Sequence, residues 1–381
     1  MHVLNVTVLL DPVTGGGTAE RTFQMSQSLV RAGIECTILS TDIGLTANRI
    51  KKLGDIRLIA LPCIWKRFFI VKFSWRHLKD LVASVDVIHL MGHWSMLNVL
   101  VAYLARQTGT PYVVCPAGEL SLFGRSHWIK QLFNLIVGHR ILREAAGHIA
   151  VTTDEIPAYE RYGIKAHRVT VIPNGINEID FSVAEVNQFK DRFGFGGAPF
   201  ILFMGRLNPI KGPDLLLEAF CSIANNYLEL HLVFAGPDGG LLDSLKKMTC
   251  EQGLTDRVHF IGYVSGHDKT HAYRAAEFLV IPSRLEAMSI VVLEAGIVGT
   301  PVLLTDRCGF DAVATVGGGR IVAATANDLA TGLESMLESP PLLKTMGVRL
   351  QFHVRQNFIW DVILEQLLDL YKQIVARKSK E

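Results

Sequence analysis

Two glutamates flank the start of a predicted helix in the second half of the chain. They lie in Ile281-Pro-Ser-Arg-Leu-Glu286-Ala-Met-Ser-Ile-Val-Val-Leu-Glu294-Ala, where an apolar strand ends at Pro282 and the apolar run after Ser289 predicts a helix. A carboxylate accepts hydrogen bonds from neighbouring hydroxyls, so Glu294 suits a ribose diol and Glu286 the hydroxyls of a sugar. The alternative is that the helix dipole favours both glutamates there without any ligand.

The start of this helix is itself a candidate anion site. The first N–H groups of a helix have no partner within the helix, and helix starts are common phosphate-binding sites. The backbone amides of Met288, Ser289 and Ile290 occupy this position. We therefore expect these amides to point at a bound anion.

A second loop carries two cations after another apolar strand, in Phe203-Met-Gly205-Arg206-Leu-Asn-Pro209-Ile-Lys211-Gly212. Arg binds two oxygens at once and Lys acts as a point charge, so Arg206 and Lys211 suit a diphosphate. The alternative is a pair of solvated surface cations, the commoner fate of these residue types. Pro209 and Gly212 constrain the turn and favour a site.

A third loop is rich in glycine and opens a helix, in Asp11-Pro-Val-Thr-Gly15-Gly16-Gly17-Thr18-Ala-Glu20. Consecutive glycines let the backbone approach a ligand closely, and the helix that follows supplies N–H donors for an anion. The spacing is not that of the Gly-x-Gly-x-x-Gly dinucleotide fingerprint. This loop alone is equally compatible with a tight turn that binds nothing.

Short apolar runs alternate with amphipathic stretches around these loops, a pattern typical of βαβ units. The first series of predicted strands is His2–Leu10, Glu35–Thr41, Arg57–Leu61, Asp86–Met91, Tyr112–Pro116, His148–Thr152 and Val169–Ile172. The second is Phe200–Gly205, His231–Gly236, Val258–Gly262, Phe278–Pro282, Val302–Thr305 and Arg320–Ala323. The chain is therefore predicted to be α/β, with two doubly wound Rossmann-like domains.

The domain boundary is expected near Pro173-Asn174-Gly175, a turn signal. The first domain then spans residues 1–172 and the second 173–357, and Phe358–Val375 reads as an amphipathic helix within a C-terminal segment of residues 358–381. Open α/β sheets bind ligands outside the carboxyl ends of their strands. Two such domains facing each other predict a cleft between them, lined by the loops described above.

Composition excludes several other classes of protein. Of the 381 residues, 49% are hydrophobic and 19% charged, which excludes a disordered chain. The formal net charge of +2 is too small for a nucleic-acid binder. The six cysteines contain no Cys-x-x-Cys pair, so neither a zinc site nor a disulfide framework is expected. Without a signal peptide or a membrane-spanning run, a cytoplasmic protein is predicted.

Taken together, these motifs resemble those of a known family. Glu286-x7-Glu294, Gly205-Arg206 with Lys211-Gly212, Pro173-Asn174-Gly175, Gly299-Thr300-Pro301-Val302 and the glycine-rich first loop occur in one order. They are similar to the motifs of the retaining glycosyltransferases of family four, which have the GT-B fold. The resemblance runs from about residue 3 to residue 375.

The resemblance implies a role for each motif. Arg206 and Lys211 would neutralise the diphosphate of a nucleotide-sugar donor, Glu294 would hold its ribose and Glu286 the transferred sugar. The amides of Met288, Ser289 and Ile290 would bind the phosphates and the sugar. Gly16 and Gly17 would approach the β-phosphate from the facing domain, and the backbone near Tyr263 and Val264 would meet the base. The C-terminal helix, with Trp360, would pack back onto the first domain.

The same resemblance implies a chemistry without a metal cofactor. No Asp-x-Asp metal signature is present, and cations would take the place of Mg²⁺ beside the leaving diphosphate. Retention would proceed on the front face of the sugar, with a donor phosphate oxygen taking the proton of the acceptor hydroxyl. No protein nucleophile is then required, and Glu286 is not assigned as one.

The sequence departs from the family pattern in two places. Ala287-Met288-Ser289 stands where the family usually has Gly-Phe-Gly, which puts the identity of the donor sugar in question. After the strand Tyr112–Pro116, many relatives carry a His, or an Arg before Gly, that faces the sugar; here the residues are Ala117-Gly118-Glu119. Glu119 is a candidate to replace that contact. His93 is a candidate sugar or acceptor contact, although a lone His is more often structural.

Residues 64–82 combine aromatic and basic side chains. Ile64, Phe68, Val71, Trp75, Leu78 and Val82 follow a helical stripe, with Lys and Arg around it. The favoured interpretation is a core-packed helix with a solvated basic flank. The alternative is an interfacial helix that docks on anionic lipid and holds the protein on the inner face of the membrane.

The predicted function is hexosyl transfer from a nucleotide-diphosphate sugar, UDP-glucose or a similar donor, to a glycan or a lipid-linked glycan, in polysaccharide biosynthesis. Two alternatives stay open. One is a catalytically silent GT-B module that binds nucleotide or acts as a scaffold, and the other is a sugar-nucleotide epimerase of the same fold. Nucleic acid is not an expected partner.

Overall fold

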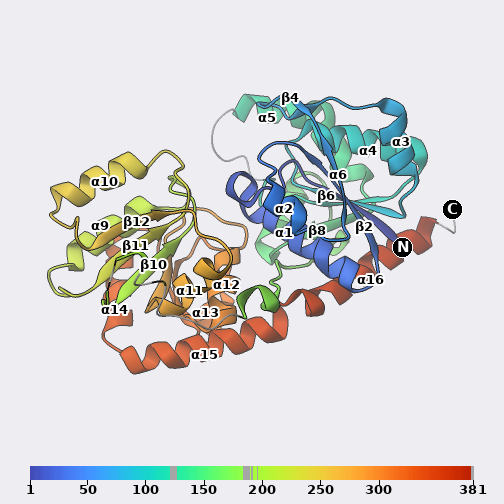
Figure 1. Ribbon diagram of the computed structural model, residues 1–381. Helices are drawn as coiled ribbons and strands as arrows, with labels where there is room; N and C mark the ends of the chain where they lie inside the picture. The colour runs from blue at the N-terminus through green and yellow to red at the C-terminus, as the bar shows by residue number, and fades with distance from the viewer. Residues whose placement is uncertain (121–126, 183–188, 190–191, 195, 379–381) are drawn as a thin grey trace. The chain divides into compact units, whose positions relative to one another are not determined.

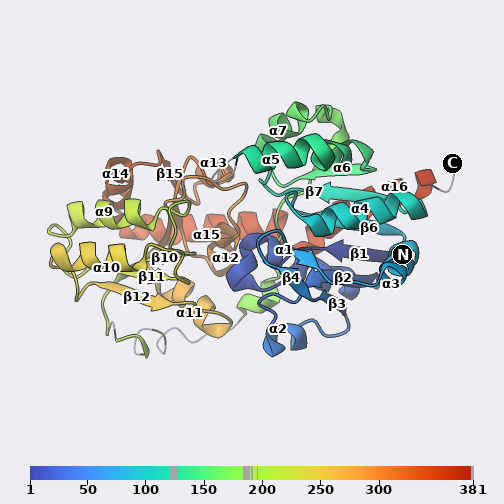
Figure 2. The same cartoon turned by 90° about the horizontal axis from the view of Figure 1, so that it is seen from above.

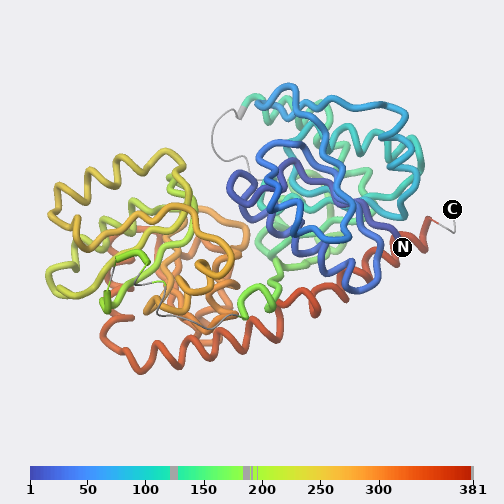
Figure 3. The backbone as a smooth tube through the Cα atoms, viewed as in Figure 1, coloured from blue at the N-terminus to red at the C-terminus, as the bar shows by residue number. Residues whose placement is uncertain are grey.

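The structure is a computed structural model that describes residues 1–120, 127–182, 189, 192–194 and 196–378. The chain divides into two units, each with its own sheet and core (Figure 1). Unit 1 consists of Met1–Gly175 together with Trp360–Glu381, and unit 2 consists of Ile176–Ile359. The chain therefore leaves unit 1 once and returns to it once, as the tube in Figure 3 traces.

Unit 1 contains a parallel sheet of seven strands in the order β3-β2-β1-β6-β7-β8-β9. The strands are β1 (His2–Val6), β2 (Glu35–Thr41), β3 (Arg57–Leu61), β6 (Val87–Met91), β7 (Tyr112–Cys115), β8 (Gly147–Ala150) and β9 (Val169–Val171). The order reverses between β1 and β6, as in doubly wound folds, so helices cover both faces (Figures 1 and 2). The inner strands β1, β2, β6, β7 and β8 are buried along almost their whole length, whereas the edge strands β3 and β9 are partly exposed.

The helices of unit 1 connect these strands. They are α1 (Pro12–Arg31), α2 (Ala47–Lys51), α3 (Trp75–Ala83), α4 (Met96–Thr108), α5 (His127–Phe133), α6 (His139–Glu144), α7 (Ile156–Arg161) and α16 (Trp360–Lys378). A π-helical turn, η1 (Asn134–Gly138), joins α5 to α6, and the short 3-10 turns are η2 (Thr153–Glu155) and η3 (Ala166–Arg168).

Unit 2 contains a parallel sheet of six strands in the order β12-β11-β10-β13-β14-β15. The strands are β10 (Phe200–Met204), β11 (His231–Ala235), β12 (Val258–Gly262), β13 (Phe278–Ile281), β14 (Val302–Thr305) and β15 (Gly319–Val322). The helical elements are η4 (Glu178–Phe181), α9 (Pro213–Ile223), α10 (Leu242–Glu251), α11 (His267–Ala275), α12 (Ile290–Val298), α13 (Ala312–Thr315), α14 (Ala326–Leu337) and α15 (Pro340–Asn357). The strands predicted from sequence are thus confirmed in both units.

The turn Pro173-Asn174-Gly175 is held against α1 and α16. The buried guanidinium of Arg21 donates from Nη1 to the carbonyl of Pro173 (2.6 Å) and to Oδ1 of Asn174 (2.9 Å). A Cβ on Gly175 would lie 2.7 Å from the indole of Trp360, so only glycine fits beneath this ring. The motif therefore has a packing role at the point where α16 begins.

The C-terminal helix packs within unit 1. Trp360 and Tyr371 are buried, and the Tyr371 hydroxyl lies 2.5 Å from Nδ1 of His89 on β6. The Nε1 of Trp360 donates to Gln24 of α1 (3.2 Å). The predicted helix agrees with α16, which runs to Lys378, while residues 379–381 of the predicted segment lie outside the described residues.

The continuous helix predicted over residues 64–82 is wrong in its first half. The chain there forms a two-stranded antiparallel hairpin, β4 (Cys63–Trp65) and β5 (Ile70–Val71), and only Trp75–Ala83 is helical. The aromatic and β-branched residues of the hairpin favour strand pairing, which overrides the helical spacing. Of the predicted apolar stripe, Ile64 and Trp75 are exposed, whereas Leu78 and Val82 are buried.

Candidate functional site

The candidate site of unit 2 lies where the strand order of its sheet reverses. Strands β10 and β13 are adjacent and parallel, so the loops that leave their carboxyl ends start side by side. These loops are residues 205–212, with both predicted phosphate cations, and residues 282–289, with Glu286. Ligands of doubly wound sheets bind at this switch point.

Arg284 joins the two loops. Its backbone N–H donates to the carbonyl of Ile210 (2.8 Å), and its Nη1 donates to the carbonyl of Pro209 (2.7 Å). The guanidinium also binds both carboxylate oxygens of Asp214 at the start of α9, at 2.8 and 2.6 Å. A bidentate pair of this kind fixes geometry as well as charge. The loops are therefore held together by a side chain that the sequence analysis did not select.

Gly212 allows the loop with Lys211 to lie against β13. Its φ is +68°, and a Cβ there would lie only 2.0 Å from the carbonyl oxygen of Pro282. Any other residue would therefore push the two loops apart. This steric requirement explains why glycine follows the lysine.

Lys211 and Glu286 form an ion pair, with 2.9 Å between Nζ and Oε1. The carboxylate is 8% exposed and the lysine side chain 35% exposed. The hydroxyl of Ser283 also donates to Oε1 of Glu286 in a short hydrogen bond. Burial, followed by the nearby Glu286 charge, raises the pKa of Cys308 to about 12, so this thiol stays protonated. Lys211, expected to meet the diphosphate, and Glu286, expected to meet the transferred sugar, are thus in direct contact.

Arg206, the other cation expected to meet the diphosphate, lies two residues after the end of β10 at Met204. A Cβ on Gly239 would lie only 2.8 Å from Cγ of Arg206. The absence of a side chain at Gly239 therefore makes room for the arginine. The amide of Lys211 donates to Oδ1 of Asn208 (3.0 Å) and closes the turn between the two cations. Both cations therefore belong to one tightly folded loop at the carboxyl edge of the sheet.

Helix α12 starts at the same edge, with Ser289 as its N-cap residue. The amide of Ser289 donates to the carbonyl of Cys308 (3.2 Å), so this predicted anion donor already has a protein partner. Its hydroxyl is buried and has no hydrogen-bond partner among the residues that the structure describes. Met288 is 7% exposed, and its side chain packs into the unit. Ile290 is the first residue of α12.

Glu294 lies in the second turn of α12 and is 2% exposed. Lys269 on α11 donates to Oε1 in a short contact, and the hydroxyl of Tyr273 donates to Oε2 (2.6 Å). Burial and the Glu294 charge raise the pKa of Tyr273 well above its usual value, so the phenol remains a donor. Lys269 and Tyr273 lie four residues apart and share a helix face. This spacing was the one feature of the sequence that could have indicated that these two residues act together.

The residues predicted to meet a nucleotide base follow β12. Tyr263 is 47% exposed, and Val264 is 6% exposed. Because β12 is parallel to β11, and β11 to β10, these residues leave the same edge of the sheet as the cationic loop. Within the described residues, no group of three or more His, Cys, Asp or Glu side chains is placed to hold a metal ion.

In unit 1, the glycine-rich loop forms an interrupted helix start. Asp11 caps it, accepting from the amide and hydroxyl of Thr14 at 2.8 and 2.9 Å. Gly16 breaks the helix with φ 58° and ψ −141°, and the space around its Cα is open. Gly17 is exposed. The kink is a conformation that glycine adopts without strain, and it leaves the backbone accessible at this point.

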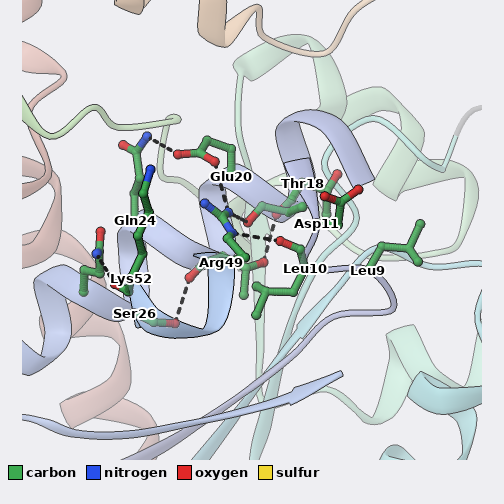
Figure 4. Close-up of polar contacts among 12 residues, drawn as sticks. Leu9, Leu10, Asp11, Thr18, Glu20, Gln24, Ser26, Arg49 and Lys52 are labelled. Atoms are coloured by element: carbon green, nitrogen blue, oxygen red, sulfur yellow. Dashed lines mark hydrogen bonds and ion pairs between the residues drawn. The ribbon is translucent and has the colours of Figure 1, made fainter. Parts of the chain in front are cut away.

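A buried arginine supports α1 behind this loop (Figure 4). Arg49 of α2 donates from Nε to the carbonyl of Leu10 (3.1 Å) and from Nη2 to Glu20 (3.0 Å). Its guanidinium lies 3.5 Å from the centre of the Phe23 ring. Glu20 also accepts from Gln24 (2.8 Å). These contacts fix the segment that carries the glycines.

His93 and Glu119 come from the loops that follow the adjacent strands β6 and β7 of unit 1. The carboxylate of Glu119 accepts from the amides of His93 (2.5 Å) and Trp94 (3.4 Å), and burial raises its pKa. His93 is 2% exposed, Nε2 lies 3.1 Å from Oδ1 of Asn134, and burial lowers its pKa to about 4. Both side chains thus form hydrogen bonds within unit 1. Their predicted contacts with a sugar stay predictions.

Comparison with known proteins gives the same division of the chain. The family model "Glycosyl transferase 4-like domain" matches residues 16–175, and the model "Glycosyl transferases group 1" matches residues 186–349. Together the two models account for most of the chain. Their border coincides with the border between unit 1 and unit 2.

Two curated relatives and one solved structure illustrate the similarity. The chain is 30% identical to "D-inositol 3-phosphate glycosyltransferase" of Nocardia farcinica, over 61% of this chain and 53% of that protein. It is 32% identical to "Mannosylfructose-phosphate synthase" of Agrobacterium fabrum, over 55% and 49%. These matches span about half of each relative. HepE of Anabaena, solved with UDP and glucose, has a TM-score of 0.81 at 18% identity, covering 98% of this chain and 100% of its own.

The solved structure supports the fold, and the two family models cover both units in the order that the motifs predicted. The chain belongs to the family-four glycosyltransferases, which have the GT-B fold.

Proposed function

We propose that the chain is a retaining glycosyltransferase that moves a hexose from a nucleotide-diphosphate sugar to a glycan or a lipid-linked glycan. The observation that carries the proposal is the cluster at the switch point of unit 2. Arg206, Lys211 and the start of α12 gather there beside two buried carboxylates. Membership of the family and the likeness to HepE, solved with UDP and glucose, favour UDP-glucose or a similar donor.

The leaving group of this reaction is a nucleoside diphosphate. The bond between the anomeric carbon and the phosphate oxygen breaks, and negative charge grows on the diphosphate. Preorganised cations stabilise that charge most effectively in a site that excludes water. Arg206 would bind two phosphate oxygens and Lys211 would supply a point charge. We assign the leaving-group charge to these two residues and require no metal.

The new bond forms between the anomeric carbon and an acceptor oxygen on the same face of the sugar. The acceptor hydroxyl gives its proton to an oxygen of the departing phosphate, so configuration is retained without a protein nucleophile. Glu286 fits a positioning role better than a nucleophilic one, because Lys211 and Ser283 already bind its Oε1. Its remaining lone pairs would accept from hydroxyls of the sugar.

We propose the other contacts with the donor as the family resemblance implies them. Glu294 would accept from the ribose hydroxyls, Tyr263 and Val264 would meet the base, and Met288, Ser289 and Ile290 would line the phosphates and the sugar. Gly16 and Gly17 would contact the β-phosphate from unit 1. The acceptor would meet unit 1, where His93 and Glu119 are candidates to shape its site.

Turnover of UDP-glucose tests this proposal. Purified protein is incubated with UDP-glucose and a chelator, and UDP release is followed with and without candidate acceptors. Release in the wild type but not in Arg206→Ala supports the transferase. Lys246→Met, which removes an exposed cation of α10, is the matched control and should not change the rate. A chain without any release would be a silent binding module, and interconversion of the donor sugar without an acceptor would indicate an epimerase.

A further inference from the structure

The hairpin β4–β5 and the start of α3 expose aromatic side chains on unit 1. Among the larger apolar side chains, Ile64 is 67% exposed, Trp65 54%, Trp75 47% and Phe73 37%. Tyr103 of α4, 51% exposed, lies beside Trp75 with 5.9 Å between ring centres. Such side chains are usually buried in a protein that functions alone in water. We call this set, with the basic residues described next, the aromatic-basic surface.

The same segment is strongly basic. Lys66, Arg67, Lys72, Arg76 and Lys79 are all exposed. No acidic residue occurs from residue 64 to residue 79, and the first that follows is Asp80. These five positive charges exceed the formal net charge of +2 of the whole chain, so the remainder of the chain is net negative. The positive charge is therefore a local property of this surface.

The surface is held in shape by the unit beneath it. The amide of Lys72 donates to the carbonyl of Pro62 (2.8 Å), and the amide of Cys63 donates to Asp42 (2.9 Å). Trp65 packs edge-on against Phe68, with 4.9 Å between ring centres. The opposite side of α3 is anchored in the core by Leu78, Leu81 and Val82. The exposed aromatic residues are thus presented on a fixed scaffold.

We propose that the aromatic-basic surface docks on an anionic lipid bilayer. Tryptophan favours the interface between headgroups and acyl chains, and Lys and Arg next to it bind anionic headgroups. A protein partner fits less well, because protein interfaces are depleted in lysine and three of the five cations here are lysines. Among the described residues, no helix is long and apolar enough to span a bilayer, so this contact would be peripheral.

The position of the hairpin connects the surface to the chemistry. β4 begins two residues after β3 ends, so the hairpin lies at the carboxyl edge of the unit 1 sheet. The glycine-rich loop and the loop with His93 leave the same edge. Resting on the proposed function, this placement makes a lipid-linked acceptor the class of substrate that docking would bring to unit 1. The docking itself does not depend on that function.

Vesicle flotation tests the proposal directly. Full-length protein is floated with vesicles of phosphatidylcholine alone or of phosphatidylcholine with phosphatidylglycerol. We expect the wild type to float only with the anionic vesicles and to be released by salt. The double variant Lys66→Glu/Arg67→Glu should weaken partitioning by at least about 30-fold, at about 1 kcal/mol for each lost basic contact. The double variant Trp65→Ala/Trp75→Ala should also weaken partitioning onto anionic vesicles, even at low salt.

Matched controls separate this surface from general stickiness. Lys246→Glu/Lys247→Glu changes two exposed cations of α10, and Phe352→Ala removes an exposed aromatic of α15. Both should float like the wild type. Thermal unfolding should be the same in all variants and shows that unit 1, which carries the surface substitutions, is folded. UDP binding, assigned here to unit 2, should also be unchanged. Since UDP binding and flotation are read separately, loss of one does not decide the other.

Three results would overturn the proposal. The first is a wild type that does not float with anionic vesicles. The second is flotation that survives both surface variants. The third is flotation lost instead in Trp128→Ala/Leu135→Ala, which would assign the contact to the exposed apolar residues of α5 and η1.

Discussion

Replacing Lys211 by methionine tests both the stability and the chemistry of the unit 2 site. The Lys211–Glu286 pair, with 2.9 Å between Nζ and Oε1, has a Coulomb energy of roughly 6 kcal/mol at an effective dielectric constant of about 20. Desolvation of the carboxylate offsets much of this energy, and water screens the lysine, which is 35% exposed. We therefore expect a net coupling of about 1–2 kcal/mol.

A double-mutant cycle with Glu286→Gln measures this coupling. The free energy of unfolding is determined by denaturant titration for the wild type, both single variants and the double variant. Of the two single variants, we expect Lys211→Met to be the more destabilising. It leaves the buried carboxylate of Glu286 with Ser283 as its remaining side-chain partner among the described residues. The double variant should recover part of that loss. Additive effects, within about 0.5 kcal/mol, would refute the coupling.

The same variants separate the two proposed roles by binding and turnover. Lys211→Met should weaken UDP binding and lower turnover by about 10²–10³-fold, the usual effect of removing one preorganised donor. Glu286→Gln should bind UDP at least as tightly as the wild type, because it releases Lys211, but should use UDP-glucose poorly. Lys246→Met should match the wild type throughout. Wild-type affinity for UDP in Lys211→Met would refute the assignment of this lysine.

Three further changes follow from the geometry. Gly212→Ala should unfold unit 2 or separate its two loops, because its Cβ would meet the carbonyl of Pro282 at 2.0 Å; thermal unfolding and UDP binding measure the loss, and wild-type values in both would contradict the reasoning. Lys269→Met should weaken binding of UDP much more than binding of its 2′,3′-dideoxy analogue, since Lys269 orients the proposed ribose ligand Glu294; an equal loss for both would exclude this role. When the pH is lowered from 6.5 to 5, the free energy of unfolding should fall less in His93→Gln than in the wild type. Denaturant titrations at each pH measure this free energy. Burial lowers the pKa of His93 in the folded state to about 4, whereas in the unfolded chain it is about 6.5. Below pH 6.5 the unfolded chain therefore binds a proton that the folded protein does not bind. The free energy of unfolding then falls by up to about 1.4 kcal/mol for each pH unit. A parallel decline in the two proteins would show that His93 is not the titrating group.

The fold was predictable because both domains obey simple periodicity. Apolar runs buried on both faces predicted the strands, and strand termini located the loops with Arg206, Lys211 and Glu286. Because β10 and β13 are neighbours, the loops with these residues leave adjacent strand ends, as expected for a doubly wound sheet. The region after β3 was mispredicted, because a helical stripe of apolar residues and a hairpin of β-branched and aromatic residues share one sequence there.

The partners of the site residues were less accessible from sequence. Lys269 and Tyr273 lie more than twenty residues before Glu294, and only the packing of α11 against α12 brings them to its carboxylate. Arg284 was visible inside the motif, but nothing in the sequence indicated that it would pair with Asp214. Glu119 was predicted to contact a sugar, and that contact stays a prediction. The hydrogen bonds from the amides of His93 and Trp94 to its carboxylate could not be predicted, because they depend on how two loops fold.

The most direct test of the central claim is a crystal structure of the chain with UDP, grown in the presence of a chelator. We predict the diphosphate against Arg206, Lys211 and the start of α12, with the ribose hydroxyls toward Glu294. Nucleotide bound elsewhere, or a diphosphate that binds only through an added metal ion, would contradict the account.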